Sequence, residues 1–134
     1  MNVRYGARAY ARVGIESGVM SASPHKLIVM LFDGAIGFIR AARLHMQAGQ
    51  VAAKGEAISK AIDVVGGLSS ALDHERGGEL AGRLESLYDY VSDLLLKANL
   101  ENSVARLDEA ERLLADIASA WREIGATAAD AAHG

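Results

Sequence analysis

The chain of 134 residues is long enough for one domain that buries a core of its own. Because it contains no cysteine, a disulfide framework and a thiolate metal site are excluded, and a reducing compartment suits it. No apolar run reaches the length of a membrane-spanning helix, so we expect a cytoplasmic protein with no membrane insertion.

Residues 1–22 differ from the rest of the chain in charge. The net charge is −3, yet residues 1–15 carry Arg4, Arg8 and Arg12 and no acidic side chain. Such an arm can stay solvated, fold back on the acidic remainder of the chain or bind nucleic acid. Because three arginines make few phosphate contacts, we expect no nucleic-acid partner. Its apolar residues favour a mobile N-terminal segment that folds back on the rest.

The segment from Ser23 to Ala42 predicts a helix with an unusually wide apolar arc. Ser23 can cap the helix and Pro24 fits its first position. The arc covers roughly two thirds of the circumference, far more than the stripe of an ordinary surface helix. Its main sector holds Leu27, Ile28, Leu31, Phe32, Ala35, Phe38, Ile39 and Ala42, and a second row holds Met30, Gly34, Gly37 and Ala41. Such a helix either is central in its domain or packs on a partner with its second face.

Three further helices follow, over about residues 51–73, 79–100 and 103–124. Gly49 suits a left-handed helix end, Gly77 and Gly78 suit a turn, and Asn102 or Ser103 can cap the last helix. The stripe of the 79–100 helix consists of Leu80, Leu84, Leu87, Tyr88, Val91, Leu94, Leu95 and Ala98. We expect Tyr88 and Trp121 in the core and Tyr90 on the surface.

Short turns force sequence neighbours to run in opposite directions, because they cannot carry the chain back along a helix of roughly 30 Å. The sequence therefore predicts an all-α, antiparallel up-down four-helix bundle over residues 23–125. The predicted bundle follows an N-terminal tail, 1–22, and precedes a frayed C-terminal tail, 126–134.

A di-iron site is the enzyme hypothesis that such a bundle invites. It needs Glu-x-x-His pairs on two helices, and the sequence has none. The histidines His25, His45, His74 and His133 fall at a helix start, a helix end, a loop and a tail. We expect a binding module without catalytic residues, metal or cofactor.

At SPHKLIVMLFDGAI, KGEAISKAIDVVGGLSSALDHERGGELAGRLESLYDYV and KANLEN, the sequence resembles the flagellar secretion chaperones of the FliS family. The resemblance covers about residues 10 to 124. It is carried by the Ser-Pro-His start, Asp33 to Ala35, Lys54 to Glu56, Gly77 to Glu79 and Leu87 to Tyr90. Phe32 departs from it, because many relatives have tyrosine there.

The resemblance implies a non-enzymatic chaperone that binds the C-terminal segment of flagellin in the cytoplasm, one to one. It would prevent premature polymerisation and deliver flagellin to the flagellar type III export apparatus, with export-gate components as further partners. The family's N-terminal segment can occupy part of the binding surface.

The resemblance and the second row of the first helix together give the predicted binding residues. These are Tyr10, Val13, Leu27, Met30, Leu31, Gly34, Gly37 and Ala41. The second row could equally pack on a helix of its own bundle. The alternative function is a regulatory or adaptor bundle that binds a non-flagellin helix or self-associates.

Overall fold

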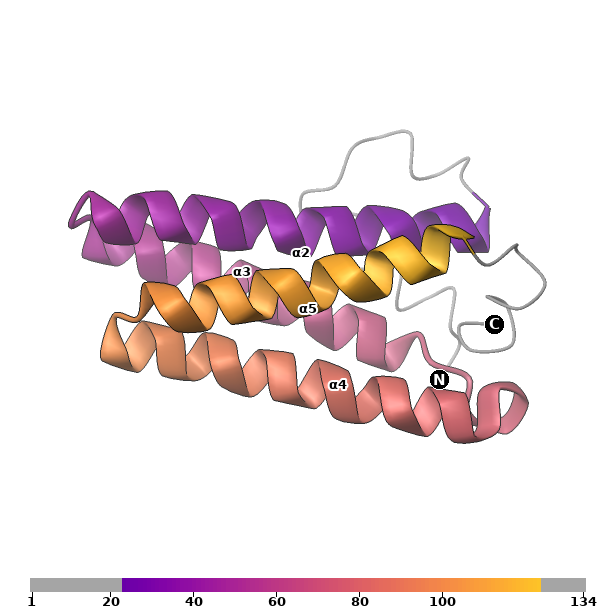
Figure 1. The fold of residues 1–134 in the computed structure, drawn as a ribbon. Helices are drawn as coiled ribbons and strands as arrows, with labels where there is room; N and C mark the ends of the chain where they lie inside the picture. Colours follow the sequence, from indigo (N-terminus) through magenta and orange to yellow (C-terminus); the bar gives the residue numbers. More distant parts are fainter. Residues whose placement is uncertain (1–22, 124–134) are drawn as a thin grey trace.

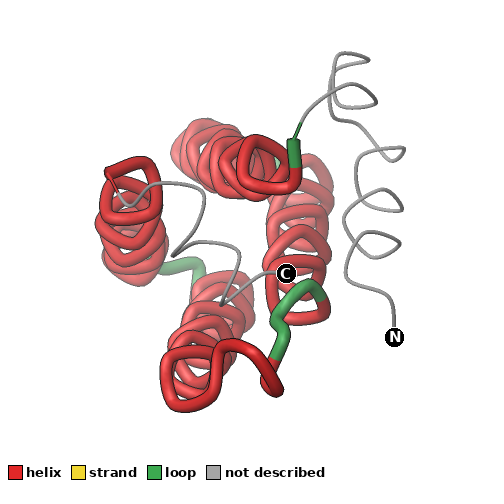
Figure 2. Tube along the Cα trace, turned by 90° about the vertical axis from the view of Figure 1, so that its right-hand side faces the viewer, coloured by secondary structure: helices red, strands yellow, loops and turns green. Residues whose placement is uncertain are grey.

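A computed structural model describes residues 23–123, which form four helices labelled as in Figure 1. They are α2 (Pro24–Gln47), α3 (Val51–Ser70), α4 (His74–Glu101) and α5 (Val104–Glu123). Each helix packs on the next and α5 packs back on α2, so the four form a ring in end view (Figure 2). Successive helices run in opposite directions (Figure 1). This confirms the predicted up-down bundle, while the predicted mobile N-terminal segment and C-terminal tail lie outside the described residues.

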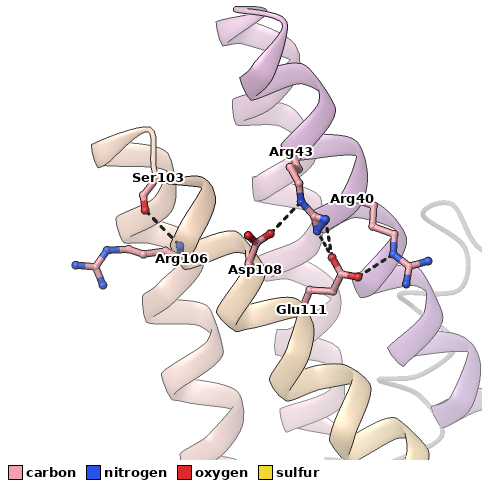
Figure 3. Close-up of polar contacts among 6 residues, drawn as sticks. All are labelled: Arg40, Arg43, Ser103, Arg106, Asp108 and Glu111. Carbon is pink, nitrogen blue, oxygen red and sulfur yellow. Dashed lines mark hydrogen bonds and ion pairs between the residues drawn. The ribbon is translucent and has the colours of Figure 1, made fainter.

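The helix ends follow the predicted capping chemistry. The Ser23 hydroxyl accepts the Lys26 N–H at 3.2 Å, and the Ser103 hydroxyl accepts the Arg106 N–H at 3.2 Å, the latter drawn in Figure 3. Gly49 follows α2 with a φ of +73°, in the left-handed region that favours glycine. Local sequence therefore fixes where α2 and α5 begin and where α2 ends.

Helix α4 begins one turn earlier than predicted. Asp73 caps it by accepting the Arg76 N–H at 3.0 Å, so the stretch His74–Gly77 is helical rather than a loop. The backbone then breaks at Gly78, where φ is +52° and ψ is −125°. Gly77 and Gly78 were predicted to shape a turn between helices, but Gly77 is helical and Gly78 alone makes a break within α4.

The core lies between the four helices and uses the main sector of α2 except Phe38, which is half-buried. Phe32 and Tyr88 are almost fully buried, with ring centroids 6.2 Å apart, and Trp121 is also buried. Burial raises the pKa of the Tyr88 phenol above its usual range. Tyr90 is exposed. All three aromatic predictions are confirmed.

Ion pairs tie α2 to α5 (Figure 3). Arg40 Nε lies 2.9 Å from a Glu111 carboxylate oxygen, and Arg43 pairs with both Glu111 and Asp108. The Glu111 and Arg43 side chains are mostly covered by their neighbours. Dissolved salt therefore screens these ion pairs less than it would screen fully exposed ones. This side of α2 is therefore occupied by a polar network, and its free apolar surface lies towards α3.

Candidate functional site

The structure separates the predicted binding residues into a buried and an accessible group. Leu27 and Leu31 are 8% and 1% exposed, so they belong to the core beneath the surface. Met30, Gly34 and Ala41 are half-buried and Gly37 is exposed. Tyr10 and Val13 lie outside the described residues.

The accessible residues form one stripe along α2, which we call the α2 ridge: Met30, Gly34, Gly37, Ala41 and Leu44. Leu44 is 68% exposed and lies one heptad beyond Gly37, which itself lies one heptad beyond Met30. A Cβ atom built on Gly37 meets nothing within 4 Å, so none of the four described helices covers that position. Sequence reasoning missed Leu44 because it ended the arc at Ala42, although the heptad spacing points to it.

A shallow hollow of about 240 Å³ runs beside the ridge at the junction of α2 and α3. Its lining consists of Phe38, Ala41, His45, Ala53, Glu56, Ala57 and Lys60. The Lys60 ammonium lies 5.8 Å from the centre of the Phe38 ring and 3.3 Å from a Glu56 oxygen. The hollow thus has an apolar floor with a charged rim, which suits the apolar face of an amphipathic helix.

A second apolar surface lies where α4 and α5 separate. Leu94, Leu87 and Leu80 are spaced by heptads along α4, and their exposed fractions rise from 2% to 37% to 48%. The two helices lie close near their connecting turn and diverge towards the other end of the bundle (Figures 1 and 2). The prediction that Leu80 and Leu87 belong to the buried stripe is therefore wrong, because α5 moves away from α4 towards that end. We call Leu80, Leu84 and Leu87 the α4 surface.

Near the closed end of that junction, a polar contact joins α4 to α5. The Tyr90 hydroxyl donates to a Glu109 carboxylate oxygen at 2.5 Å, and this bond to the carboxylate raises the pKa of Tyr90. Arg106 pairs with Glu101 at 2.8 Å across the turn, which raises the Arg106 pKa. The two helices are thus held together at one end and left apart at the other.

The start of α2 and the end of α5 are joined by a contact that the sequence did not predict. His25 Nε2 lies 3.0 Å from the Trp121 carbonyl oxygen, and Trp121 Nε1 donates to the His25 carbonyl oxygen at 3.2 Å. Their rings stack with centroids 5.1 Å apart, and Arg122 pairs with Asp33 beside them. Residues so far apart in the chain carry no local pattern that could reveal the pair.

The described residues contain no group of three or more His, Asp or Glu side chains placed to hold a metal ion. Within the same residues, every helix is too short or too polar to cross a bilayer.

Comparison with known proteins gives a consistent assignment. The family model described as Flagellar protein FliS matches residues 6–128. The flagellar secretion chaperone FliS of Salmonella typhimurium is 54% identical over 120 residues, which is 89% of both chains. The Escherichia coli K12 protein of that name is 45% identical over 88% of both chains, and the Bacillus subtilis protein is 31% identical over 81% of this chain and 80% of its own. The chain therefore belongs to the FliS family of flagellar secretion chaperones.

Proposed function

We propose that this protein binds the C-terminal segment of flagellin in the cytoplasm, keeps it from polymerising early and delivers it to the flagellar type III export apparatus. The names of its relatives, flagellar secretion chaperones, support this role. The complex contains one flagellin per chaperone, and export-gate components receive it. In this proposal the protein acts without a cofactor, without nucleic acid and without a catalytic step.

The observation that carries the proposal is the α2 ridge. A bundle that served only its own stability would leave such a stripe polar, whereas Gly37 and Leu44 keep it apolar and no residue between 23 and 123 covers it. An amphipathic helix laid along the stripe removes its own apolar face from water, and Gly37 lets the two backbones come close. Flagellin's terminal segment, disordered before assembly, would gain helix as it binds.

Simple magnitudes indicate that the ridge does not act alone. Burying a large apolar side chain contributes roughly 1.5 to 3 kcal/mol, and ordering each residue of a flexible client costs about 1 to 2 kcal/mol. The ridge offers Met30 and Leu44 as large side chains, too few to offset the ordering of a whole helix. We infer that the client also covers the α4 surface. Tyr10 and Val13, outside the described residues, complete the proposed site as a displaceable cover.

The test is a matched pair of substitutions measured for binding to a flagellin C-terminal fragment. Gly37→Glu places a charge on the ridge, and Gly82→Glu places the same charge on α4, where a Cβ atom also meets nothing within 4 Å. We expect Gly37→Glu to weaken binding at least tenfold, Gly82→Glu to leave it unchanged, and both to melt close to the parent protein. Met30→Glu should behave like Gly37→Glu.

Two results would count against the proposal. A folded Gly37→Glu protein that binds flagellin as tightly as Gly82→Glu would remove the ridge from the site. Failure of the unsubstituted protein to bind the fragment, together with capture of another helix, would favour the adaptor function instead.

A further inference from the structure

A second hollow, of about 280 Å³, lies at the end of the bundle where the α2–α3 and α4–α5 turns meet. We call it the end pocket. Its lining consists of Met46, Gly49, Gln50, Val51, Lys54, Asn99, Leu100 and Asn102. None of these residues belongs to the α2 ridge or to the α4 surface, so the end pocket is a separate site.

Lys54 gives the end pocket a buried positive charge. The residue is 6% exposed, and its ammonium donates to the Asn99 carbonyl oxygen and to Asn102 Oδ1, both at 3.2 Å. Both acceptors are neutral, and no carboxylate of the described residues forms an ion pair with this ammonium. A largely buried charge without a counter-charge is costly, and a bound carboxylate would offset that cost.

The N-terminus of α3 adds to the same preference. Gln50 holds the capping position, but its side chain makes no capping bond and instead lies 2.7 Å from His45 Nδ1. The first amides of a helix have no partner within the helix, and the aligned peptide dipoles make this end positive. Free amides beside a buried ammonium form a suitable environment for a carboxylate.

The rim of the end pocket is apolar. Val51 and Leu100 are 71% and 85% exposed, the two most exposed large apolar side chains of the described residues. The polar lining beside them, Asn99, Asn102 and Gln50, carries no charge. The ligand that matches this lining is a carboxylate next to an apolar side chain.

We propose that the end pocket receives the α-carboxylate at the C-terminus of the client, with the adjoining apolar side chain against Val51 and Leu100. The assignment to an α-carboxylate rests on the proposed function, whose client segment ends in a chain terminus. A side-chain carboxylate of the same segment has the same chemistry, so the experiment must distinguish the two sources.

The experiment compares two flagellin C-terminal peptides, identical except that one ends in a free carboxylate and the other in an amide, by calorimetry at low salt. We expect amidation to weaken binding about tenfold. With Lys54→Met, which keeps the apolar part of the side chain, the acid peptide should lose about tenfold and the amide peptide little. The effects of amidation and substitution should therefore not add, as expected for groups in contact.

Gln50→Asp is the second variant and does not depend on how Lys54→Met folds. It supplies an internal carboxylate at the capping position, which should raise the melting temperature and abolish the preference for the acid peptide. Equal affinity of the unsubstituted protein for the two peptides, with both bound, overturns the proposal and leaves the proposed function standing. Equal affinity combined with weaker binding to Lys54→Met assigns the pocket to a side-chain carboxylate. If neither peptide binds, the proposed function fails and this inference fails with it.

Discussion

At the scale of single residues, the contact between His25 and Trp121 shows how the bundle closes. It links α2 to α5 through two hydrogen bonds and a stacked pair of rings, at the end where Arg122 also reaches Asp33. The side chain of His25 contributes one of those bonds and the stack. The carbonyl of His25 would still accept from Trp121 if the imidazole were removed.

We expect His25→Ala to lower the free energy of unfolding by about 1 to 2 kcal/mol, the sum of one net hydrogen bond and one aromatic contact. Urea denaturation followed by fluorescence measures this, since Trp121 is the one tryptophan of the chain. Lys26→Ala is the control, because that side chain is exposed and its substitution should change stability by less than about 0.5 kcal/mol. Equal stability of the two variants would show that the stacked pair contributes nothing.

Residues differ in how far the sequence could predict them. Ser23, Gly49 and Ser103 act through their immediate neighbours, so their roles follow from local patterns. Lys54 and His25 act on partners in other helices, and nothing in the spacing of the chain indicates those partners. Apart from Leu44, which the heptad spacing of α2 indicates, the missed residues are accordingly ones that depend on contacts between helices.

At the scale of an element, α4 combines a broken backbone with an exposed apolar side. Gly78 has a φ of +52°, which an L side chain rarely adopts, whereas Gly82 lies in regular helix with open space around its Cβ position. The periodicity of α4 predicted a continuous buried stripe. That prediction assumed that a neighbouring helix packs along the whole length of α4. Leu80 and Leu87 are exposed since α5 diverges from them, and a divergence between helices leaves no trace in the pattern of either one.

The same substitution at these two glycines should have opposite effects. Gly78→Ala should destabilise the protein by about 1 kcal/mol or more, because alanine is strained at that φ. Gly82→Ala should stabilise it by up to about 1 kcal/mol, because alanine favours helix. Thermal melts of both variants measure the difference. A stabilising Gly78→Ala would mean that the break at Gly78 is absent in solution.

At the scale of the whole molecule, two apolar surfaces lie on the outside of a bundle whose four described helices share one core. The α2 ridge and the α4 surface lie on different helices, so a client that covers both must extend around the bundle. Ion pairs occupy the α2–α5 side, so under the proposed function the client would bind on the α3 side of the ridge. The architecture could be predicted from helix periodicity and short turns, whereas the placement of the free surfaces required the packing of the helices.

Such a client should bind one to one and fold as it binds. Light scattering of the mixture with a flagellin C-terminal fragment should give the mass of one chaperone and one fragment. Circular dichroism should show more helix than the sum of the separate proteins, because the fragment becomes helical while the bundle is retained. A complex without added helical signal would contradict coupled folding.

The most direct test of the α2 ridge uses the absence of cysteine from the chain. Gly37→Cys and Gly82→Cys each introduce a single thiol at a helical position with open space around it. The rate of maleimide modification is measured with and without a saturating flagellin C-terminal fragment. We expect the fragment to slow the reaction of the Gly37→Cys variant at least tenfold and to leave that of Gly82→Cys unchanged. Equal rates for Gly37→Cys in the free and bound protein would contradict the assignment of the ridge as the binding surface.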